Sequence, residues 1–441
     1  MKSVQDLING KGQKLYNKAK TMIPGGTQLL SKRPEMFAPN LWPAYYSRSK
    51  GYKVWDLENN EYDDMSIMGI GACVLGYADD YIDNAVIESI KSGSASTLNS
   101  FEEVQLAESL IDLHPWFQQV RYTKSGGEAV SVAIRIARAS TRKEKILFSG
   151  YHGWSDWYLA ANLSNDSSLD GQLMPGLEPL GIPRGLTGTS MPFDLNNFDE
   201  LLRLSSENKD DIAAIILEPA RGDSPPIETL TKIRELADSI GAVLIFDEIT
   251  SGFRECTGGI HRKFDIKPDI AIFAKGMGNG YPIAAILGKS KIMNSAQDTF
   301  ISSTNWTERT GFVAALKTIE KFELNNVSNS LISNGKKVKS IWADAAKQNN
   351  LSIKISGLDS LPSFTFDSKD SLEHSTVYCI EMLKRNMLGF RQFKPSYAHD
   401  EEVIQRYKKN TFEIFSIIKN QEYNSKELSK AHSGFFRLVK E

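Results

Sequence analysis

Short apolar segments separated by helical patterns constrain the fold of this chain more than any other feature. Between about residues 80 and 320, runs such as "IAAIILEPA" (212–220), "AVLIFDEIT" (242–250) and "IAIFAKG" (270–276) alternate with segments of helical periodicity. Runs that are apolar on both faces are typical of a mostly parallel sheet covered by helices on both sides. We therefore predict an α/β fold, in which ligands bind beyond the carboxyl ends of the strands.

The regions on either side of this segment predict a second, smaller domain. A chain of 441 residues is too long for one ordinary hydrophobic core. We expect residues 1–60 to form an N-terminal arm and part of the small domain, and residues 61–320 to form the large domain. Residues 321–441 are expected to complete the small domain as an α+β unit, because helical patterns there flank two short strand-like segments.

Composition and charge exclude several classes of partner. A formal net charge of −2 gives no electrostatic reason to expect nucleic acid or an acidic membrane as partner. Cys73, Cys256 and Cys379 are too scattered for a disulfide framework or a zinc site, and we expect no metal. No run reaches the roughly 18 apolar residues of a membrane span, and the lysine-rich start does not resemble a secretory signal. We therefore expect a cytoplasmic protein that binds neither nucleic acid nor membranes.

Lys275 ends one of the apolar runs and is followed by the glycine-rich "GMGNG" (276–280). One interpretation is an amphipathic lysine whose amine reaches solvent. The glycines favour another, because they let a ligand approach the backbone, and a desolvated lysine amine forms Schiff bases with aldehydes. A P-loop also combines lysine with glycines, but Ile283 stands where that motif needs its first glycine.

Asp247 follows four apolar residues at the end of another run. A carboxylate that emerges from a buried strand needs a partner, or its burial costs several kcal/mol. A helix cap and a magnesium ligand of an NTPase are alternative roles, although the second requires a P-loop. A pyridinium nitrogen is a third suitable partner. Asp247 precedes Lys275 by one strand–helix–strand unit, which places both at the same edge of the sheet.

Two further segments follow predicted strands. Ser125, Gly126 and Gly127 open a helix, whose backbone N–H groups and dipole form an anion site, although an ordinary capped helix start has the same pattern. Tyr151 offers a flat ring for stacking, and His152 beside it is open to a structural role. A lysine nucleophile, a carboxylate, a phosphate site and a stacking ring together match the needs of pyridoxal 5′-phosphate (PLP).

These motifs resemble the class III PLP-dependent aminotransferases of fold type I, and most closely the branch that contains glutamate-1-semialdehyde 2,1-aminomutase. The resemblance is carried by "SGGEA", "GYHG", "LEPARGD", "IFDEITSGFR" and the Lys275 loop. It implies a large domain with a mostly parallel, seven-stranded type of sheet, PLP as cofactor and a homodimer with shared active sites. It assigns the internal aldimine to Lys275, the pyridine nitrogen to Asp247, the ring faces to Tyr151 and Ile249, and the phosphate to Ser125, Gly126, Gly127 and, from the other subunit, Thr304. Glu218 also matches a family glutamate.

Several positions depart from the family pattern. The segment after Thr304 reads "NWTERT", and "SGGEA" lacks the hydroxyl of the family's "SGTEA". Many transaminases have a glutamate after "EP" that pairs with a switching arginine, and Asp223 occupies that position. The aminomutase arginine that grips a carboxylate falls on Lys32, with Arg33 adjacent. Candidate substrate residues are Lys32, Arg33, Asp223, Trp154 and Glu308.

The sequence therefore predicts an aminotransferase that moves an amino group from a small-molecule donor to an aldehyde or ketone acceptor. An intramolecular aminomutase is the main alternative, and an amino-acid racemase would use the same residues. A non-catalytic cofactor- or sugar-binding protein is a further alternative, but the presence of both Lys275 and Asp247 argues against it.

Overall fold

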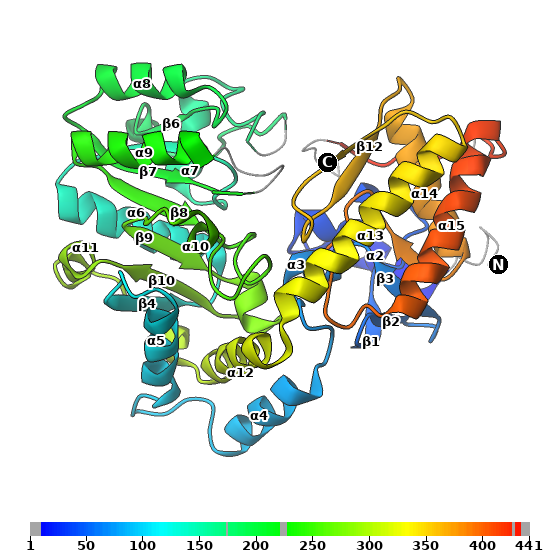
Figure 1. Cartoon of the computed structure of the whole chain (residues 1–441), viewed down its shortest axis with the longest axis horizontal. Coiled ribbons are helices and arrows are strands. Elements are labelled where there is room, and N and C mark those ends of the chain that lie inside the picture. The colour runs from blue at the N-terminus through cyan, green and yellow to red at the C-terminus, as the bar shows by residue number, and fades with distance from the viewer. Residues whose placement is uncertain (1–9, 173–174, 221–226, 426–427, 434–441) are drawn as a thin grey trace. The chain divides into compact units, whose positions relative to one another are not determined.

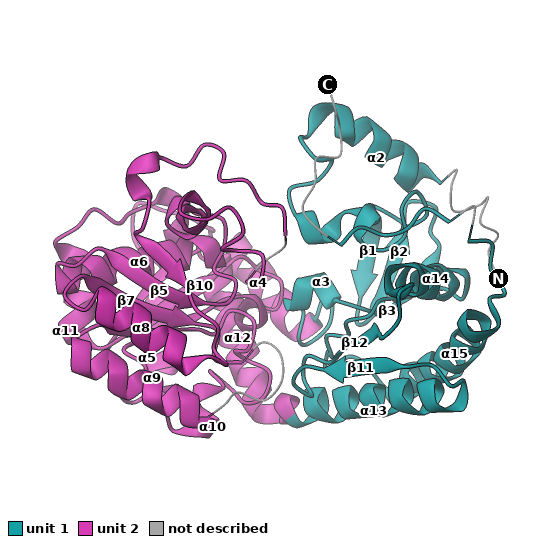
Figure 2. Ribbon diagram, turned by 90° about the horizontal axis from the view of Figure 1, so that it is seen from above, with its two compact units in different colours: residues 1–79, 329–441 teal, residues 80–328 magenta. Residues whose placement is uncertain are grey.

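The chain divides into two compact units (Figure 2). Each unit has its own hydrophobic core. The structure, a computed structural model, describes residues 10–172, 175–220, 227–425 and 428–433. Unit 1 consists of residues 1–79 and 329–441, and unit 2 consists of residues 80–328. None of the helices in the described ranges is long and apolar enough to cross a bilayer.

Unit 2 is built on a seven-stranded sheet in the order β4-β10-β9-β8-β7-β5-β6 (Figure 1). Only β10 runs antiparallel to its neighbours, so the predicted mostly parallel α/β sheet is confirmed. The strands are β4 (Gln119–Thr123), β5 (Lys145–Ser149), β6 (Ser190–Pro192), β7 (Ile212–Leu217), β8 (Val243–Asp247), β9 (Ile270–Phe273) and β10 (Ala284–Gly288).

Helices cover both faces of this sheet because its strands are apolar on both sides. Every residue of β7, β8, β9 and β10 is buried. Alternate strand residues pack with α6 (Gly126–Thr141) on one face and with α8 (Phe198–Glu207) and α9 (Ile227–Ile240) on the other. The remaining helices of unit 2 are α4 (Asp80–Lys91), α5 (Glu102–Leu113), α7 (Asp156–Leu159), α10 (His261–Phe264), α11 (Ser290–Met293), α12 (Thr310–Asn325) and the short η3 (Ala160–Leu163), η4 (Arg184–Leu186), η5 (Lys275–Gly278), η6 (Asn294–Gln297) and η7 (Thr304–Thr307).

Unit 1 joins the two ends of the chain in a four-stranded sheet, ordered β1-β2-β3-β13. Its strands are β1 (Tyr46–Lys50), β2 (Lys53–Asp56), β3 (Glu61–Met65) and β13 (Met387–Gly389), and a hairpin is formed by β11 (Ile353–Ser356) and β12 (Ser363–Phe366). The helices are α2 (Lys11–Met22), α3 (Met68–Gly71), α13 (Val327–Gln348), α14 (Ser371–Lys384), α15 (Glu401–Asn420), η1 (Leu30–Lys32) and η2 (Pro34–Met36).

The units divide the chain at 79/80 and 328/329, whereas the sequence led us to expect boundaries at 60/61 and 320/321. Strand β3 accounts for part of the first difference, because it pairs in parallel with β13 from the C-terminal region. Residues 61–65 therefore share a sheet with unit 1. Whether either unit folds as an independent domain stays a prediction.

Candidate active site

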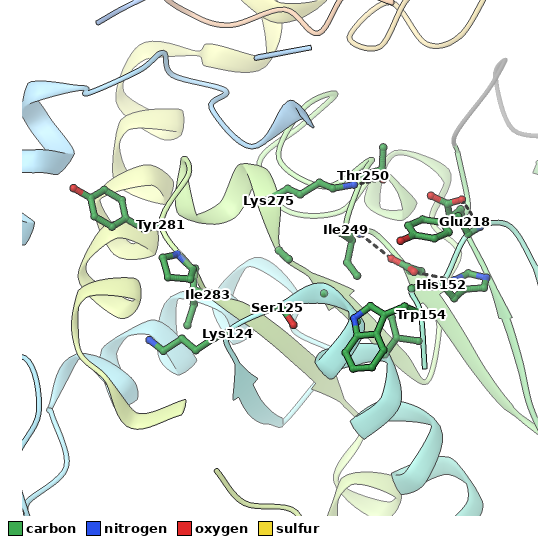
Figure 3. Close-up of a pocket in the computed structure, with 18 residues that line it drawn as sticks. Lys124, Ser125, His152, Trp154, Glu218, Ile249, Thr250, Lys275, Tyr281 and Ile283 are labelled. Carbon is green, nitrogen blue, oxygen red and sulfur yellow. Dashed lines mark hydrogen bonds and ion pairs between the residues drawn. The ribbon is translucent and has the colours of Figure 1, made fainter. Parts of the chain in front are cut away.

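Polar side chains that follow five strands of unit 2 line one pocket (Figure 3). The chain leaves β4, β5, β7, β8 and β9 at the same edge of the sheet, because these strands are parallel to one another. The residues that follow them line a cavity of about 270 Å³. That volume is near the lower end of the roughly 300–1,000 Å³ of small-molecule sites. From these exits the pocket receives Ser125, Gly126, Tyr151, Glu218, Asp247, Ile249 and Lys275.

Lys275 lies at the end of β9, where its amine enters the pocket. Its Nζ donates a hydrogen bond to Thr250 Oγ1 at 2.9 Å. The backbone of Lys275 has φ of +44°, a left-handed conformation that is unusual for a residue with a side chain. Gly276 and Gly278 are buried immediately after it, and an added Cβ on Gly278 would lie 2.7 Å from Ile283. The glycine-rich turn therefore packs too closely for side chains at that position.

Asp247 and His152 form a buried pair at the base of the pocket. Asp247 Oδ2 lies 2.8 Å from His152 Nδ1, and both side chains are at most 2% exposed. The other nitrogen of His152, Nε2, lies 3.1 Å from the Ser149 carbonyl. Burial raises the pKa of Asp247 above its ordinary value, and the hydrogen bond from His152 offsets part of that rise. The Asp247 carboxyl therefore faces the pocket without solvent around it. A cation on a bound ligand would stabilise its ionised form.

The loop after β5 is held by Glu218, at the end of β7. Glu218 Oε2 accepts a hydrogen bond from the Tyr151 amide at 2.9 Å. Gly150 has φ of +112°, and an added Cβ there would lie 2.7 Å from Glu218 Oε2. Glycine at position 150 therefore allows the carboxylate to reach the backbone of Tyr151. Both Tyr151 and Ile249 line the pocket and pack on the core of unit 2.

The first turn of α6 contributes backbone donors. Ser125 and Glu128 form a capping box, in which Glu128 Oε2 accepts from the amides of Lys124 and Ser125 at 3.1 and 2.9 Å. Among the described residues, the amides of Gly126 and Gly127 have no recorded hydrogen-bond acceptor. Their N–H groups stand at the positive end of the helix dipole, in the wall of the pocket. Such a helix start suits an anion.

The structure separates the remaining predicted residues into three groups. Trp154 lines the pocket. Glu308 binds Lys124 instead, with Oε2 at 2.9 Å from Lys124 Nζ, and Thr304 is exposed in η7 of the same unit. Of the other predicted substrate residues, Lys32 and Arg33 belong to unit 1, and Asp223 lies outside the described residues.

Sequence reasoning missed several residues of the pocket. Lys124, Thr250, Tyr281 and Pro282 line it. Thr250 lies three residues after Asp247, and Lys124 directly precedes Ser125. Their closeness in the sequence to these two predicted site residues could have indicated that they line the pocket. Tyr281 follows the Lys275 glycines and donates to Asp83 Oδ1 at 2.9 Å, and burial together with this contact raises its pKa to about 12. His152 was considered structural, and its contact with Asp247 shows what it positions.

Comparison with known proteins agrees with this geometry. Residues 37–388 match the family model described as aminotransferase class III. A 3-aminobutyryl-CoA aminotransferase of Cloacimonas acidaminovorans (strain Evry) is 33% identical over 405 residues, which cover 89% of this chain and 93% of that protein. A glutamate-1-semialdehyde 2,1-aminomutase of Methanosphaera stadtmanae is 32% identical over 381 residues, which cover 83% and 86%. The solved PLP internal aldimine form of the FumI protein from Sphingopyxis sp. MTA144 has the same fold, with a TM-score of 0.85, 24% identity and coverage of 96% and 99%.

The chain belongs to the class III aminotransferase family. Its fold is the type I fold of PLP-dependent transaminases, and the predicted aminotransferase function and PLP cofactor are confirmed at this level. The aminomutases among its relatives represent a related branch.

The pocket fits PLP by the chemistry of its donors. A lysine amine suits an aldehyde, and a buried carboxyl suits a protonated ring nitrogen. The amides of Gly126 and Gly127 suit a phosphate. The glycines also keep the site open, since an added Cβ on Gly126 would lie 2.8 Å from Ile249.

Proposed function

We propose that this chain is an aminotransferase with a separate amino donor and carbonyl acceptor, and that Lys275 is its catalytic lysine. The observation that carries the proposal is the Lys275 amine, which shares a pocket with the buried Asp247–His152 pair and the start of α6. When bound, PLP supplies an aldehyde that condenses with amines and a ring that accepts electrons from the substrate carbon.

The residues of the chain perform the binding and proton-transfer tasks. Asp247 pairs with the ring nitrogen, and His152 fixes the orientation of that carboxylate through Nδ1. Thr250 Oγ1 holds the Lys275 Nζ by accepting its hydrogen bond. As the free amine, Lys275 Nζ would take a proton from the substrate carbon and deliver it to the cofactor carbon that keeps the transferred nitrogen. Tyr151 and Ile249 cover the two ring faces, and Ser125, Gly126 and Gly127 bind the phosphate.

A separate donor and acceptor are favoured over an intramolecular aminomutase by the segment that follows Thr304. Glu308 is held there by Lys124 and by the Thr310 amide at 2.8 Å. Arg309 in turn binds the buried Glu102 through two of its nitrogens. This packing belongs to the "NWTERT" sequence and not to the family pattern. The name of one relative, 3-aminobutyryl-CoA aminotransferase, also supports transfer of an amino group over an intramolecular rearrangement.

We also propose that the enzyme is a cytoplasmic homodimer in which Thr304 of the partner subunit reaches the phosphate. Exposure of Thr304 in η7 leaves it available for such a contact. Lys32 and Arg33 are proposed to recognise an anionic group on the substrate, with Trp154, Asp223 and Glu308 as further candidate substrate residues.

The first test is the identity of the reactive lysine. Borohydride reduction of the native holoenzyme, followed by peptide mapping, is expected to leave a pyridoxyl label on Lys275. The Lys275→Ala variant is expected to lose the label and at least about 10³-fold in kcat, because a nucleophile and a proton carrier are removed together. A labelled lysine elsewhere, or turnover by Lys275→Ala, would contradict the proposal.

A second measurement separates the aminotransferase from the aminomutase. An aminotransferase releases one keto acid from the donor for each product amine. Turnover of a single amino-aldehyde without any added donor and without release of a keto acid would favour the aminomutase instead.

A further inference from the structure

Trp154 has an unusual environment for a large apolar side chain. It is 70% exposed although it lines the pocket. Among the described residues, its indole nitrogen has no recorded acceptor. Figure 3 shows the ring beside Ser125 at the start of α6, with its nitrogen on the side that faces Ser125. An exposed indole that keeps a free N–H at a ligand pocket needs an explanation.

The backbone around Trp154 is fixed against the first turn of α6. Gly153 has φ of +100°, and an added Cβ on it would lie 3.2 Å from Gly127 Cα. Ser131 Oγ donates to the Gly127 carbonyl at 2.9 Å and lies 2.6 Å from Ser155 Oγ, so that Ser155 donates to Ser131. The loop therefore holds Trp154 in place even though its ring is exposed.

The indole occupies the space that a side chain at position 127 would need. An added Cβ on Gly127 would lie 3.0 Å from Trp154 Nε1 and 3.3 Å from Cδ1. Position 127 is the one where the family pattern "SGTEA" has a hydroxyl and this chain has glycine. The indole N–H thus stands next to the place from which that hydroxyl would act.

We propose that Trp154 Nε1–H donates a hydrogen bond to the PLP phosphate and replaces the missing hydroxyl at position 127. Gly127 and Trp154 then form one unit, since the glycine makes room for the indole and the indole supplies the donor. This inference rests on the proposed phosphate site at the start of α6. An indole N–H is a donor only, which suits a phosphate oxygen, and hydrogen bonds to charged groups are the stronger ones.

The test compares two ligands that differ by the phosphate. The cofactor-free full-length protein is titrated with PLP and with pyridoxal, and binding is followed by absorbance. Trp154→Phe keeps an aromatic ring and removes the N–H. We expect it to weaken PLP binding by about tenfold and to leave pyridoxal binding unchanged. The matched control is Trp116→Phe, because the Trp116 N–H is buried without a partner among the described residues and Trp116 does not line the pocket.

A double-mutant cycle tests the pairing of the two positions. Gly127→Thr alone is expected to weaken PLP binding, because its Cβ meets the indole. Gly127→Thr in the Trp154→Ala background is expected to strengthen binding relative to Trp154→Ala, because the hydroxyl regains its place.

The proposal is overturned if Trp154→Phe leaves PLP binding unchanged, or weakens PLP and pyridoxal equally. It is also overturned if Gly127→Thr has the same effect in both backgrounds. Borohydride labelling of Lys275 is measured in every variant. Loss of the label in the parent protein would instead contradict the proposed function itself.

Discussion

At the residue scale, burial decides which protonation states the unit 2 core tolerates. His114 is fully buried, and burial lowers its pKa to about 3. Its Nδ1 lies 2.8 Å from the Leu110 carbonyl, and the Gly259 amide donates to Nε2. A neutral imidazole satisfies both contacts, because Nδ1–H donates to Leu110 and Nε2 accepts from Gly259. In a protonated imidazole, the N–H at Nε2 would face the N–H of Gly259.

This neutral histidine predicts a pH-dependent loss of stability. The unfolded chain binds a proton at His114 below about pH 6.5, and the folded chain does not until about pH 3. The free energy of unfolding therefore falls as pH drops through this window, by about 2 kcal/mol at pH 5 from this residue. In urea unfolding, His114→Phe is expected to be less stable at pH 7 but to lose less stability between pH 7 and 5 than the parent.

His374→Phe is the control for this prediction, because that imidazole is only partly buried, although burial lowers its pKa as well. An identical pH dependence in His114→Phe and the parent would contradict the buried neutral state of His114.

At the scale of elements, the ends of the parallel strands determine the site. Beyond the end of each of these strands, the chain turns and a side chain points toward the pocket. After β5, Gly150 lies in this turn. Both its positive φ and its closeness to Glu218 disfavour a side chain at this position. A side chain at position 150 would therefore displace either the carboxylate or the Tyr151 amide that it accepts from.

We expect Gly150→Ala to weaken PLP binding and to lower the thermal stability. Gly93→Ala is the matched control, since Gly93 has a similar φ of +99° but no atom of the described part of the chain lies within 4 Å of an added Cβ. Both variants incur a backbone penalty of about 1–2 kcal/mol, and only Gly150→Ala adds the clash. Equal losses of stability and of PLP affinity in the two variants would show that Glu218 does not position Tyr151.

At the scale of the whole molecule, three large apolar side chains of unit 2 remain exposed. Phe300, Leu98 and Phe101 are 84%, 80% and 62% exposed. Apolar side chains that gather in a contiguous exposed patch are typical of surfaces that meet another protein. These residues support the proposed homodimer, in which Thr304 of the partner subunit completes the phosphate site.

Mixed dimers provide the test of shared sites. Thr304→Glu places a carboxylate against the phosphate and is expected to inactivate its homodimer, as Lys275→Ala does. When the two inactive variants are mixed and exchange subunits, one site in each mixed dimer has an intact Lys275 and an intact Thr304, and activity returns. If Thr304 acted within its own chain, the mixture would stay inactive, and a monomer in sedimentation analysis would contradict the dimer directly.

The sequence by itself determined the sheet and the residues at its edge. Runs that are apolar on both faces require burial on both sides, so the strands could be predicted from local pattern. Lys275, Asp247 and Ser125 follow such strands, and parallel pairing brings them to one edge. The limits of the two units are harder to predict from local pattern, because β3 pairs with β13 more than 300 residues away in the chain.

Only the tertiary structure decided which side chains pair across that edge. His152 contacts Asp247, Lys124 contacts Glu308, and Trp154 occupies the space beside Gly127. No periodicity predicts these pairs, because they join separate strand ends whose distance depends on sheet order and loop conformation. The local pattern thus determined where the chemistry lies, and the packing of distant segments determined the partners of each functional group.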